Sequence, residues 1–162
     1  MKYILTSIFF LGIILCSSCK DKAPKNTEIE QHTEAFVGIM EKHLNAVTNR
    51  DLPTLQSTMH PGGKMQLILP GMEIIHGVDG FMEYHKDWFS DENWTFDTKI
   101  LNTDVGEQFG MAITEIVYRE PERDGAPYFN RMIVSYVLEH VNGNWYIIKD
   151  HASSIEKSTD QQ

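Results

Sequence analysis

Cysteine is scarce in this sequence, and its scarcity limits what can stabilise the fold. Only Cys16 and Cys19 occur in 162 residues, and both lie within the first twenty. The rest of the chain has no cysteine for a disulfide, for redox chemistry or for a zinc site. Its stability must therefore come from packing.

Basic residues are also few. The chain has 14 Lys and Arg against 23 Asp and Glu, a formal net charge of -9 with histidine neutral. Because binding to phosphates requires clustered Lys and Arg, we expect no nucleic acid partner and no electrostatic attachment to an anionic membrane.

The motifs of several enzyme classes are absent. The sequence has no Gly-rich phosphate loop, no Gly-x-Ser-x-Gly element and no His-Glu-x-x-His zinc motif. Its seven histidines are scattered rather than paired at metal-ligand spacing, at positions 32, 43, 60, 76, 85, 140 and 151. We therefore expect no metal and no cofactor.

One apolar run stands at the N-terminus. Lys2 precedes the run Tyr3–Leu15, which is too short to span a bilayer and has the length of a signal-peptide core. The run ends in Cys16-Ser17-Ser18-Cys19, which resembles the lipobox of bacterial lipoproteins. The resemblance implies that residues 1–18 are a lipoprotein signal peptide and that Cys19 is acylated, with Cys16 as the alternative. A plain signal peptide and an uncleaved anchor are the competing interpretations.

This interpretation places the protein in the bacterial cell envelope, held to a membrane by lipid. Removal of residues 1–18 takes away one lysine and no acidic residue, which leaves 13 basic and 23 acidic residues and a net charge of -10. Residues 19–27 read as a polar tether. Residues 28–155 then form one domain, and residues 156–162 a polar tail.

Helical periodicity is confined to the first half of this domain. The spacing of Phe36, Met40, His43 and Val47 predicts an amphipathic helix over residues 28–49. Asp51 is placed to cap a short second helix that ends near residue 59, ahead of a Pro-Gly-Gly turn. A third helix is predicted over residues 79–89.

The second half alternates with a period of two. Long strands are predicted over residues 94–103, 107–119, 128–141 and 145–151, and shorter ones over 64–69 and 73–76. Helices followed by a meander of strands predict an α+β fold with a curved antiparallel sheet. The strand over 128–141 is apolar on both faces, so we expect its second face to be covered, most simply by a homodimer.

A family resemblance rests on the long first helix and on four segments after it. They are Asn49–Leu52 at the second helix, Leu55–His60 ahead of a short strand, His76–Phe81 at the third helix, and the ending Gly143–Ser154. In this order they resemble the SnoaL-like branch of the NTF2-like superfamily, over about residues 30–154. The resemblance implies an NTF2-like cone, in which a curved sheet wraps around three N-terminal helices, encloses a pocket and often dimerises through its outer face. It implies no single activity, because such domains include isomerases, cyclases, dehydratases and non-catalytic modules.

Two residues are candidates for catalysis. Strand alternation places Trp145, Ile147, Lys149 and His151 on one face, and the resemblance implies that this face turns toward the pocket. The alternative for His151 is a local hydrogen bond beside Ser153. Glu115 stands among apolar residues of its strand, where its pKa would rise and suit an acid or base. Its alternative is an ion pair with Arg131 or Arg119.

Other residues are candidates for ligand binding. Arg131 would hold a substrate carboxylate or pair with Glu115. His60 stands at the end of the second helix, and two orientations are open for it: toward the pocket, where it would bind ligand, or into solvent. Aromatic side chains either form pocket walls or simply pack, namely Tyr84, Trp88, Tyr118 and Trp145.

These candidates predict that the domain binds a small, partly apolar molecule in an interior pocket. One alternative is a cofactor-independent isomerase, cyclase or dehydratase, with Glu115 or His151 moving a proton while Arg131 or Tyr118 stabilises an oxyanion. The other is a non-catalytic module of envelope assembly.

Overall fold

The computed structural model describes residues 25–161. The predicted signal peptide, with Cys16 and Cys19, lies outside the described residues. Among the helices that are described, none has both the length and the apolar character needed to cross a membrane.

Three helices precede the long strands, close to their predicted positions. They are α1 (Lys25–Thr48), α2 (Leu52–Ser57) and α3 (Gly77–Trp88). The predicted apolar stripe of α1 is confirmed, because Phe36, Met40, His43 and Val47 are all buried. The α2 helix begins where Asp51 accepts a hydrogen bond from the Thr54 backbone N–H at 3.0 Å, an N-cap that satisfies a free donor.

Six strands form one sheet in the order β2-β1-β6-β5-β4-β3. Their bounds are β1 (Gln66–Ile68), β2 (Ile74–His76), β3 (Thr95–Val105), β4 (Phe109–Arg123), β5 (Ala126–Val141) and β6 (Asn144–Lys157), followed by the 3-10 turn η1 (Ser158–Gln161). Neighbouring strands are antiparallel except that β1 runs parallel to β6. The sheet is therefore mixed rather than wholly antiparallel, since no hairpin joins β1 to β6 and fixes their direction.

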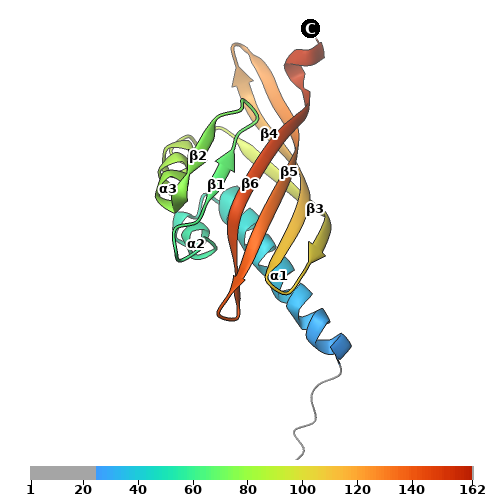
Figure 1. The fold of residues 1–162 in the computed structure, drawn as a ribbon. Coiled ribbons are helices and arrows are strands. Elements are labelled where there is room, and N and C mark those ends of the chain that lie inside the picture. The colour runs from blue at the N-terminus through green and yellow to red at the C-terminus, as the bar shows by residue number, and fades with distance from the viewer. Residues whose placement is uncertain (1–24, 162) are drawn as a thin grey trace, which may run out of the picture.

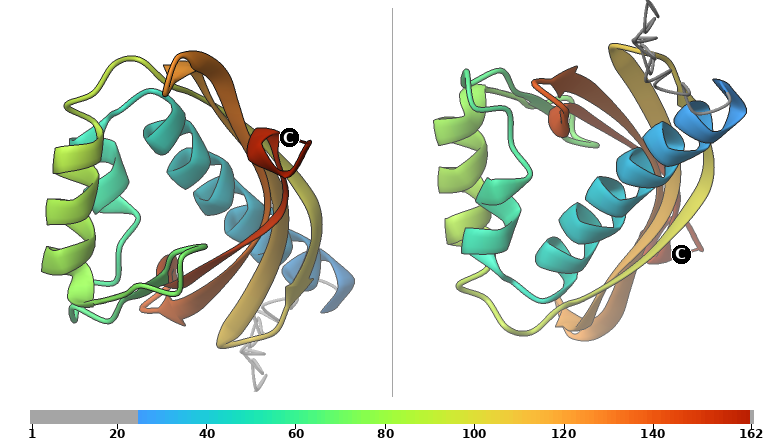
Figure 2. Two further views of the ribbon diagram at one scale, coloured as in Figure 1. Left: turned by 90° about the horizontal axis from the view of Figure 1, so that it is seen from above. Right: turned by 90° about the horizontal axis from the view of Figure 1, so that it is seen from below.

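The sheet curves around the helices (Figure 1). Seen from above and below, β3 to β6 form a bent wall, α1 crosses its concave side, and α3 stands opposite (Figure 2). The core between these layers includes Phe36 of α1, Phe81 of α3, and Leu138 and Trp145 of the sheet, each at most 1% exposed. This is the predicted α+β architecture, with helices inside a curved sheet.

A β-bulge in β6 decides which of its side chains turn toward the helices. Leu138 of β5 pairs with Ile147, but the preceding Val137 pairs with Lys149, so Ile148 is an extra residue. Before the bulge, Trp145 and Ile147 are buried on the helix side, whereas after it Asp150 and Ala152 are. The residues of β6 that face the helices are therefore odd-numbered before the bulge and even-numbered after it.

The outer face of the sheet is partly apolar, as the two-sided pattern of β5 predicted. Met132, Val134, Tyr136 and Leu138 are buried on the helix side. The side chains that alternate with them on β5, and the corresponding ones on β4, face outward and are half-buried or exposed. They include Ile113, Ile133, Val137, Met111 (38% exposed) and Phe109 (52% exposed). A homodimer through this face stays a prediction.

Candidate functional site

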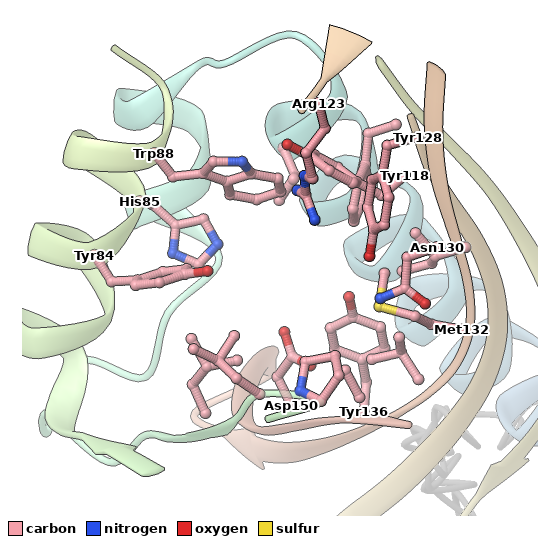
Figure 3. Close-up of a pocket in the computed structure, with 18 residues that line it drawn as sticks. Tyr84, His85, Trp88, Tyr118, Arg123, Tyr128, Asn130, Met132, Tyr136 and Asp150 are labelled. Carbon is pink, nitrogen blue, oxygen red and sulfur yellow. The ribbon is translucent and has the colours of Figure 1, made fainter. Parts of the chain in front are cut away.

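A cavity of about 420 Å³ lies between α3 and the concave side of the sheet. The helix α3 contributes Tyr84, His85 and Trp88, whose spacing of one and four residues places them on neighbouring faces of the helix. Alternate residues of β5 line the opposite wall, from Asn130 to Tyr136, and β6 adds Asp150 (Figure 3). The volume is within the usual range of small-molecule sites, about 300–1,000 Å³.

Aromatic contacts hold one end of the cavity wall in place. Trp88 stacks on Trp94 with ring centroids 4.4 Å apart and an interplanar angle of 15°. Its ring also meets Phe96 edge-on at 5.4 Å and Tyr118 at 6.1 Å. Phe96 and Tyr118 are cross-strand partners on β3 and β4, so strand register brings these two rings together.

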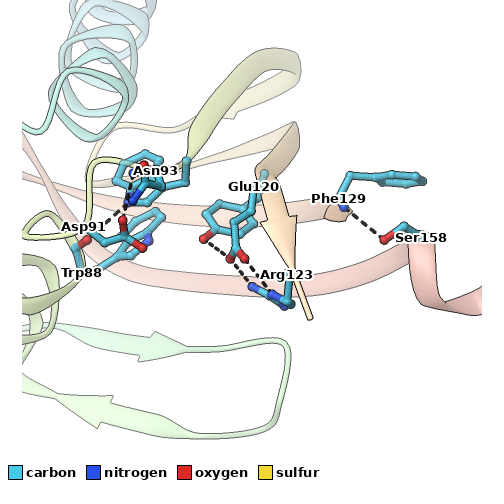
Figure 4. Close-up of polar contacts among 9 residues, drawn as sticks. Trp88, Asp91, Asn93, Glu120, Arg123, Phe129 and Ser158 are labelled. Atoms are coloured by element: carbon cyan, nitrogen blue, oxygen red, sulfur yellow. Dashed lines mark hydrogen bonds and ion pairs between the residues drawn. The ribbon is translucent and has the colours of Figure 1, made fainter. Parts of the chain in front are cut away.

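An arginine stands at the β4 end of the cavity. The Arg123 guanidinium lies 3.5 Å from the centre of the Tyr128 ring, and its Nε donates to Glu120 Oε2 at 2.9 Å. The Tyr118 hydroxyl donates to the other oxygen of Glu120 at 2.5 Å. Figure 4 shows the contact between Arg123 and Glu120. The Arg123 side chain is 40% exposed, so this side of the cavity reaches solvent. The hydrogen bond from Arg123 lowers the pKa of Glu120, which keeps that carboxylate charged.

Two buried histidines beside the cavity are neutral. Nδ1 of His85 lies 2.8 Å from the Phe81 carbonyl, which can only accept, so His85 carries its proton on Nδ1. Thr58 donates its hydroxyl to the Leu55 carbonyl at 2.6 Å and therefore accepts from Nδ1 of His43 at 2.8 Å. Burial lowers the pKa of His85 to about 4. The pKa of His43 is lowered to about 3, mainly by burial and additionally by electrostatic repulsion from His85.

Asp150 is the carboxyl group of this cavity. It is 8% exposed, and within residues 25–161 its side chain has no hydrogen bond or ion pair. Burial alone raises its pKa to about 7. Burial is the main cause of the raised pKa of Tyr136, and the charge of Asp150 adds to it. For Tyr84, burial is again the main cause of the raised pKa, followed by the charge of Glu73 and then by that of Asp150. The carboxyl and these two hydroxyls therefore share one electrostatic environment.

The structure separates the predicted ligand-binding residues into two groups. Tyr84, Trp88 and Tyr118 line the cavity. Trp145 does not, because it packs against Phe36 in the middle of α1, with ring centroids 5.2 Å apart. His60 also lies outside, where its Nδ1 accepts from the Gly62 N–H at 2.9 Å and its Nε2 is 3.4 Å from Glu139.

The structure does not bring the candidates Glu115, Arg131 and His151 together in the cavity, and it shows the alternative ion pair between Glu115 and Arg131. Glu115 and Arg131 occupy odd positions of β4 and β5, whose even positions face the helices. There Arg131 donates to Glu156 at 3.0 and 2.8 Å and to Glu115 at 3.4 Å, an ion-pair arrangement on the outer face. His151 is exposed because the bulge at Ile148 turns it outward and turns Asp150 inward.

Asp150 was missed because a bulge leaves no mark in a single sequence. The sequence does show Asp150 as an acidic residue next to His151 in an apolar strand. Simple alternation along the strand, however, assigns Asp150 to the face turned away from the helices. Among the described residues, no group of three or more His, Cys, Asp or Glu side chains is arranged to hold a metal ion. The cavity can bind a molecule by apolar contact, hydroxyl groups and one carboxyl group.

Comparisons with known proteins agree on one fold. A family model for the SnoaL-like domain matches residues 38–156, and no curated protein matches the sequence. Among solved structures, a hexachlorocyclohexane dehydrochlorinase from Novosphingobium barchaimii is 13% identical, with 82% of this chain and 92% of that chain covered and a TM-score of 0.71.

Two further solved structures are similar. An NTF2-like protein from Shewanella oneidensis is 15% identical, with 75% and 98% of the two chains covered and a TM-score of 0.59. The association domain of C. elegans CaMKII is 21% identical, with 79% and 98% covered and a TM-score of 0.59. At such identities these likenesses show the fold alone.

Proposed function

This chain belongs to the SnoaL-like domain family and has an α+β NTF2-like fold, and from that membership we propose that it binds a small, partly apolar molecule in its interior cavity. The observation that carries the proposal is the cavity itself, whose described lining residues include six aromatic side chains and one carboxyl group that has no hydrogen bond or ion pair with another described residue. Apolar walls with a few converging polar groups are the usual make-up of a ligand site.

A cavity-filling variant tests this proposal. Ala152 lines the cavity and Ser153, its neighbour, is exposed on the opposite face of β6. A ligand that binds the native state raises its stability, by about 2.7 kcal/mol at a concentration of 100 Kd. In a thermal-shift screen of flat apolar compounds, we expect hits that are lost in Ala152→Phe and kept in Ser153→Phe. A screen without hits, or hits that both variants keep, would contradict binding in this cavity.

A proton-transfer enzyme is the second candidate, and the pKa of Asp150 favours it. With a pKa of about 7, this carboxyl is half ionised near neutral pH, the condition under which a general base works well. Asp150 would take a proton from the carbon between a carbonyl group and a C=C bond, while the C–H electron pair forms a new C=C bond and the carbonyl π pair moves to the oxygen. The Tyr136 hydroxyl would donate a hydrogen bond to that oxygen. As the carbonyl re-forms, the proton would return to the far carbon of the original C=C bond. Asp150 thus replaces Glu115 and His151 as the candidate base.

Isotope exchange tests this second candidate. The bicyclic ketone 2-tetralone carries acidic protons beside its carbonyl, and NMR follows their replacement by deuterium in D₂O. An enzyme of this kind accelerates the exchange, and Asp150→Asn removes the acceleration while Glu115→Gln, on the outer face, retains it. A wild-type rate equal to that of buffer argues for binding without catalysis.

A homodimer through the outer face of the sheet completes the proposal. Its support is the partly exposed apolar surface that includes Ile133 and Val137, and a structural neighbour is an association domain. We expect Ile133→Glu to halve the mass in sedimentation, because a charge would be buried at the contact. The same change at Ile74, 52% exposed on the edge strand β2, should leave the mass unchanged. A wild-type monomer would refute the dimer.

The membrane anchor remains part of the proposal and rests on the sequence. Acylation of Cys19 would hold the domain at the bacterial envelope. Mass spectrometry of the protein purified from membranes tests it. A chain that retains residues 1–18 with an unmodified Cys19 would overturn it.

A further inference from the structure

Aromatic rings line the cavity together with aliphatic side chains. The rings belong to Tyr84, Trp88, Phe96, Tyr118, Tyr128 and Tyr136. The hydroxyls of Tyr118 and Tyr136 point into the space from opposite sides (Figure 3). Because the face of an aromatic ring carries negative electrostatic potential, such a wall attracts a positive charge.

The carboxyl group within these walls lacks the partner that buried carboxylates normally have. Asp150 has no hydrogen bond or ion pair from its own side chain to any other described residue. A buried carboxylate is costly unless a cation or several donors compensate it. In the empty cavity the group avoids this cost by binding a proton, whereas a bound cation would let it ionise.

Arg123 is the one permanent cation among the described residues that line the cavity, and it is already engaged. Arg123 forms an ion pair with Glu120 and lies over the Tyr128 ring. The two nearby histidines, His43 and His85, are neutral. An anionic ligand would therefore meet Asp150 without finding a free positive group among the lining residues.

We propose that the ligand of this cavity is a small organic cation, a protonated or quaternary amine on a flat apolar body, whose charge sits between the aromatic faces and the Asp150 carboxylate. The inference rests on the proposed binding function and names the chemical class of its ligand. The net charge of -9 acts in the same direction, since it favours the approach of cations.

Three probes that share one ring system test the assignment. They are tryptamine, which is cationic, 3-propylindole, which is neutral and of the same shape, and indole-3-propionate, which is anionic. In isothermal titration calorimetry we expect tryptamine to bind at least tenfold more tightly than 3-propylindole, and indole-3-propionate to bind most weakly. Loss of tryptamine binding in Ala152→Phe places the site in the cavity.

A matched pair of variants isolates the carboxyl group. Asp150→Asn keeps the shape and removes the charge, and we expect it to abolish the preference for tryptamine over 3-propylindole. Glu115→Gln makes the same change on the outer face of the sheet and should preserve the preference. A preference that survives Asp150→Asn would overturn the role of Asp150.

The wild-type protein offers a second test, because Asp150 must ionise to hold a cation. Burial lowers the pKa of His85 to about 4 and that of His43 to about 3, and it raises the pKa values of Tyr84, Tyr118 and Tyr136, so none of these five groups titrates between pH 6 and 8 in place of Asp150. On β1, the apolar Leu67 pairs beside Asp150. The other charged or titratable groups near the cavity are Arg123 and Tyr128, which line it, and Glu120, which pairs with Arg123. Glu73 is a further charge, which acts on Tyr84.

The affinity for tryptamine should therefore rise with pH. With a pKa of about 7, the ionised fraction grows from about one tenth at pH 6 to about nine tenths at pH 8, so the affinity rises about tenfold. At pH 7, binding should release about half a proton, which calorimetry in buffers of different ionisation enthalpy measures. The binding of 3-propylindole should release none.

The outcomes separate this inference from the proposal on which it rests. Equal binding of tryptamine and 3-propylindole, or tighter binding of indole-3-propionate, would refute the cation while leaving the cavity a ligand site. An affinity for tryptamine that does not change with pH would also refute it. Failure of tryptamine to bind, while other compounds stabilise the protein, refutes the cation alone. Failure of every compound refutes both.

Discussion

Replacement of Asp150 by asparagine should stabilise the protein, and the effect should depend on pH. The carboxyl group has a pKa of about 7 in the fold, against the ordinary value of 3.8 that represents the unfolded chain. Between these values the native state holds a proton that the unfolded chain has released. Because the native state binds more protons there, the free energy of unfolding falls as pH rises through this window. Below pH 3.8 the carboxyl has no such effect, and above pH 7 the loss is complete.

The size of the effect follows from the two pKa values. A difference of one pKa unit corresponds to about 1.4 kcal/mol, so the ionised carboxyl destabilises the fold by about 4 kcal/mol at pH 8 and by less than about 1 kcal/mol at pH 4. The variant lacks this titration, although its amide adds a contribution that does not change with pH. The advantage of Asp150→Asn should therefore grow by about 4 kcal/mol from pH 4 to pH 8.

Urea denaturation at several pH values measures this difference. Wild-type protein, Asp150→Asn and the outer-face control Glu115→Gln should be compared at pH 4, 6 and 8 without ligand. The control loses only a partly exposed ion pair with Arg131, so it should stay within about 1 kcal/mol of the wild type at each pH. A difference between Asp150→Asn and wild type that is constant with pH, or that shrinks as pH rises, would show that Asp150 is solvated or paired and would refute the reasoning.

Two further predictions concern packing and a buried hydrogen bond. A Cβ at Gly110 would lie 2.5 Å from the Phe36 ring, so Gly110→Ala should destabilise the fold by about 1–3 kcal/mol in the same denaturation assay. Gly38 lies on α1 with open space around it, so Gly38→Ala should stabilise the fold by up to about 1 kcal/mol. Thr58→Val removes the partner of the fully buried His43 Nδ1 and should cost about 1–3 kcal/mol, while Thr58→Ser keeps the hydroxyl and most of the stability. Equal effects of Val and Ser would show that the hydrogen bond contributes little.

The elements of the fold were largely predictable from local patterns. The stripe of Phe36, Met40, His43 and Val47 and the capping by Asp51 identify α1 and α2, and the turn Asn142-Gly143 identifies the β5–β6 hairpin. Tyr84, Trp88 and Tyr118 were singled out as aromatic wall residues, and they line the cavity. These signals lie within a few residues along the chain, which is why a sequence displays them.

The functional face of the sheet was not predictable in the same way. Both faces of β4 and β5 are apolar, so hydrophobicity did not say whether Glu115 or Thr114, Arg131 or Asn130, turns inward. Spacing and local propensity were enough to predict the helices, the strands, the family and the aromatic character of the cavity. That Asp150 and not His151 lines the cavity became visible in the folded protein alone. The physical reason is the bulge at Ile148, which arises from pairing between two strands, and the desolvation of Asp150 by side chains from α3 and β5, neither of which exists until the chain has folded.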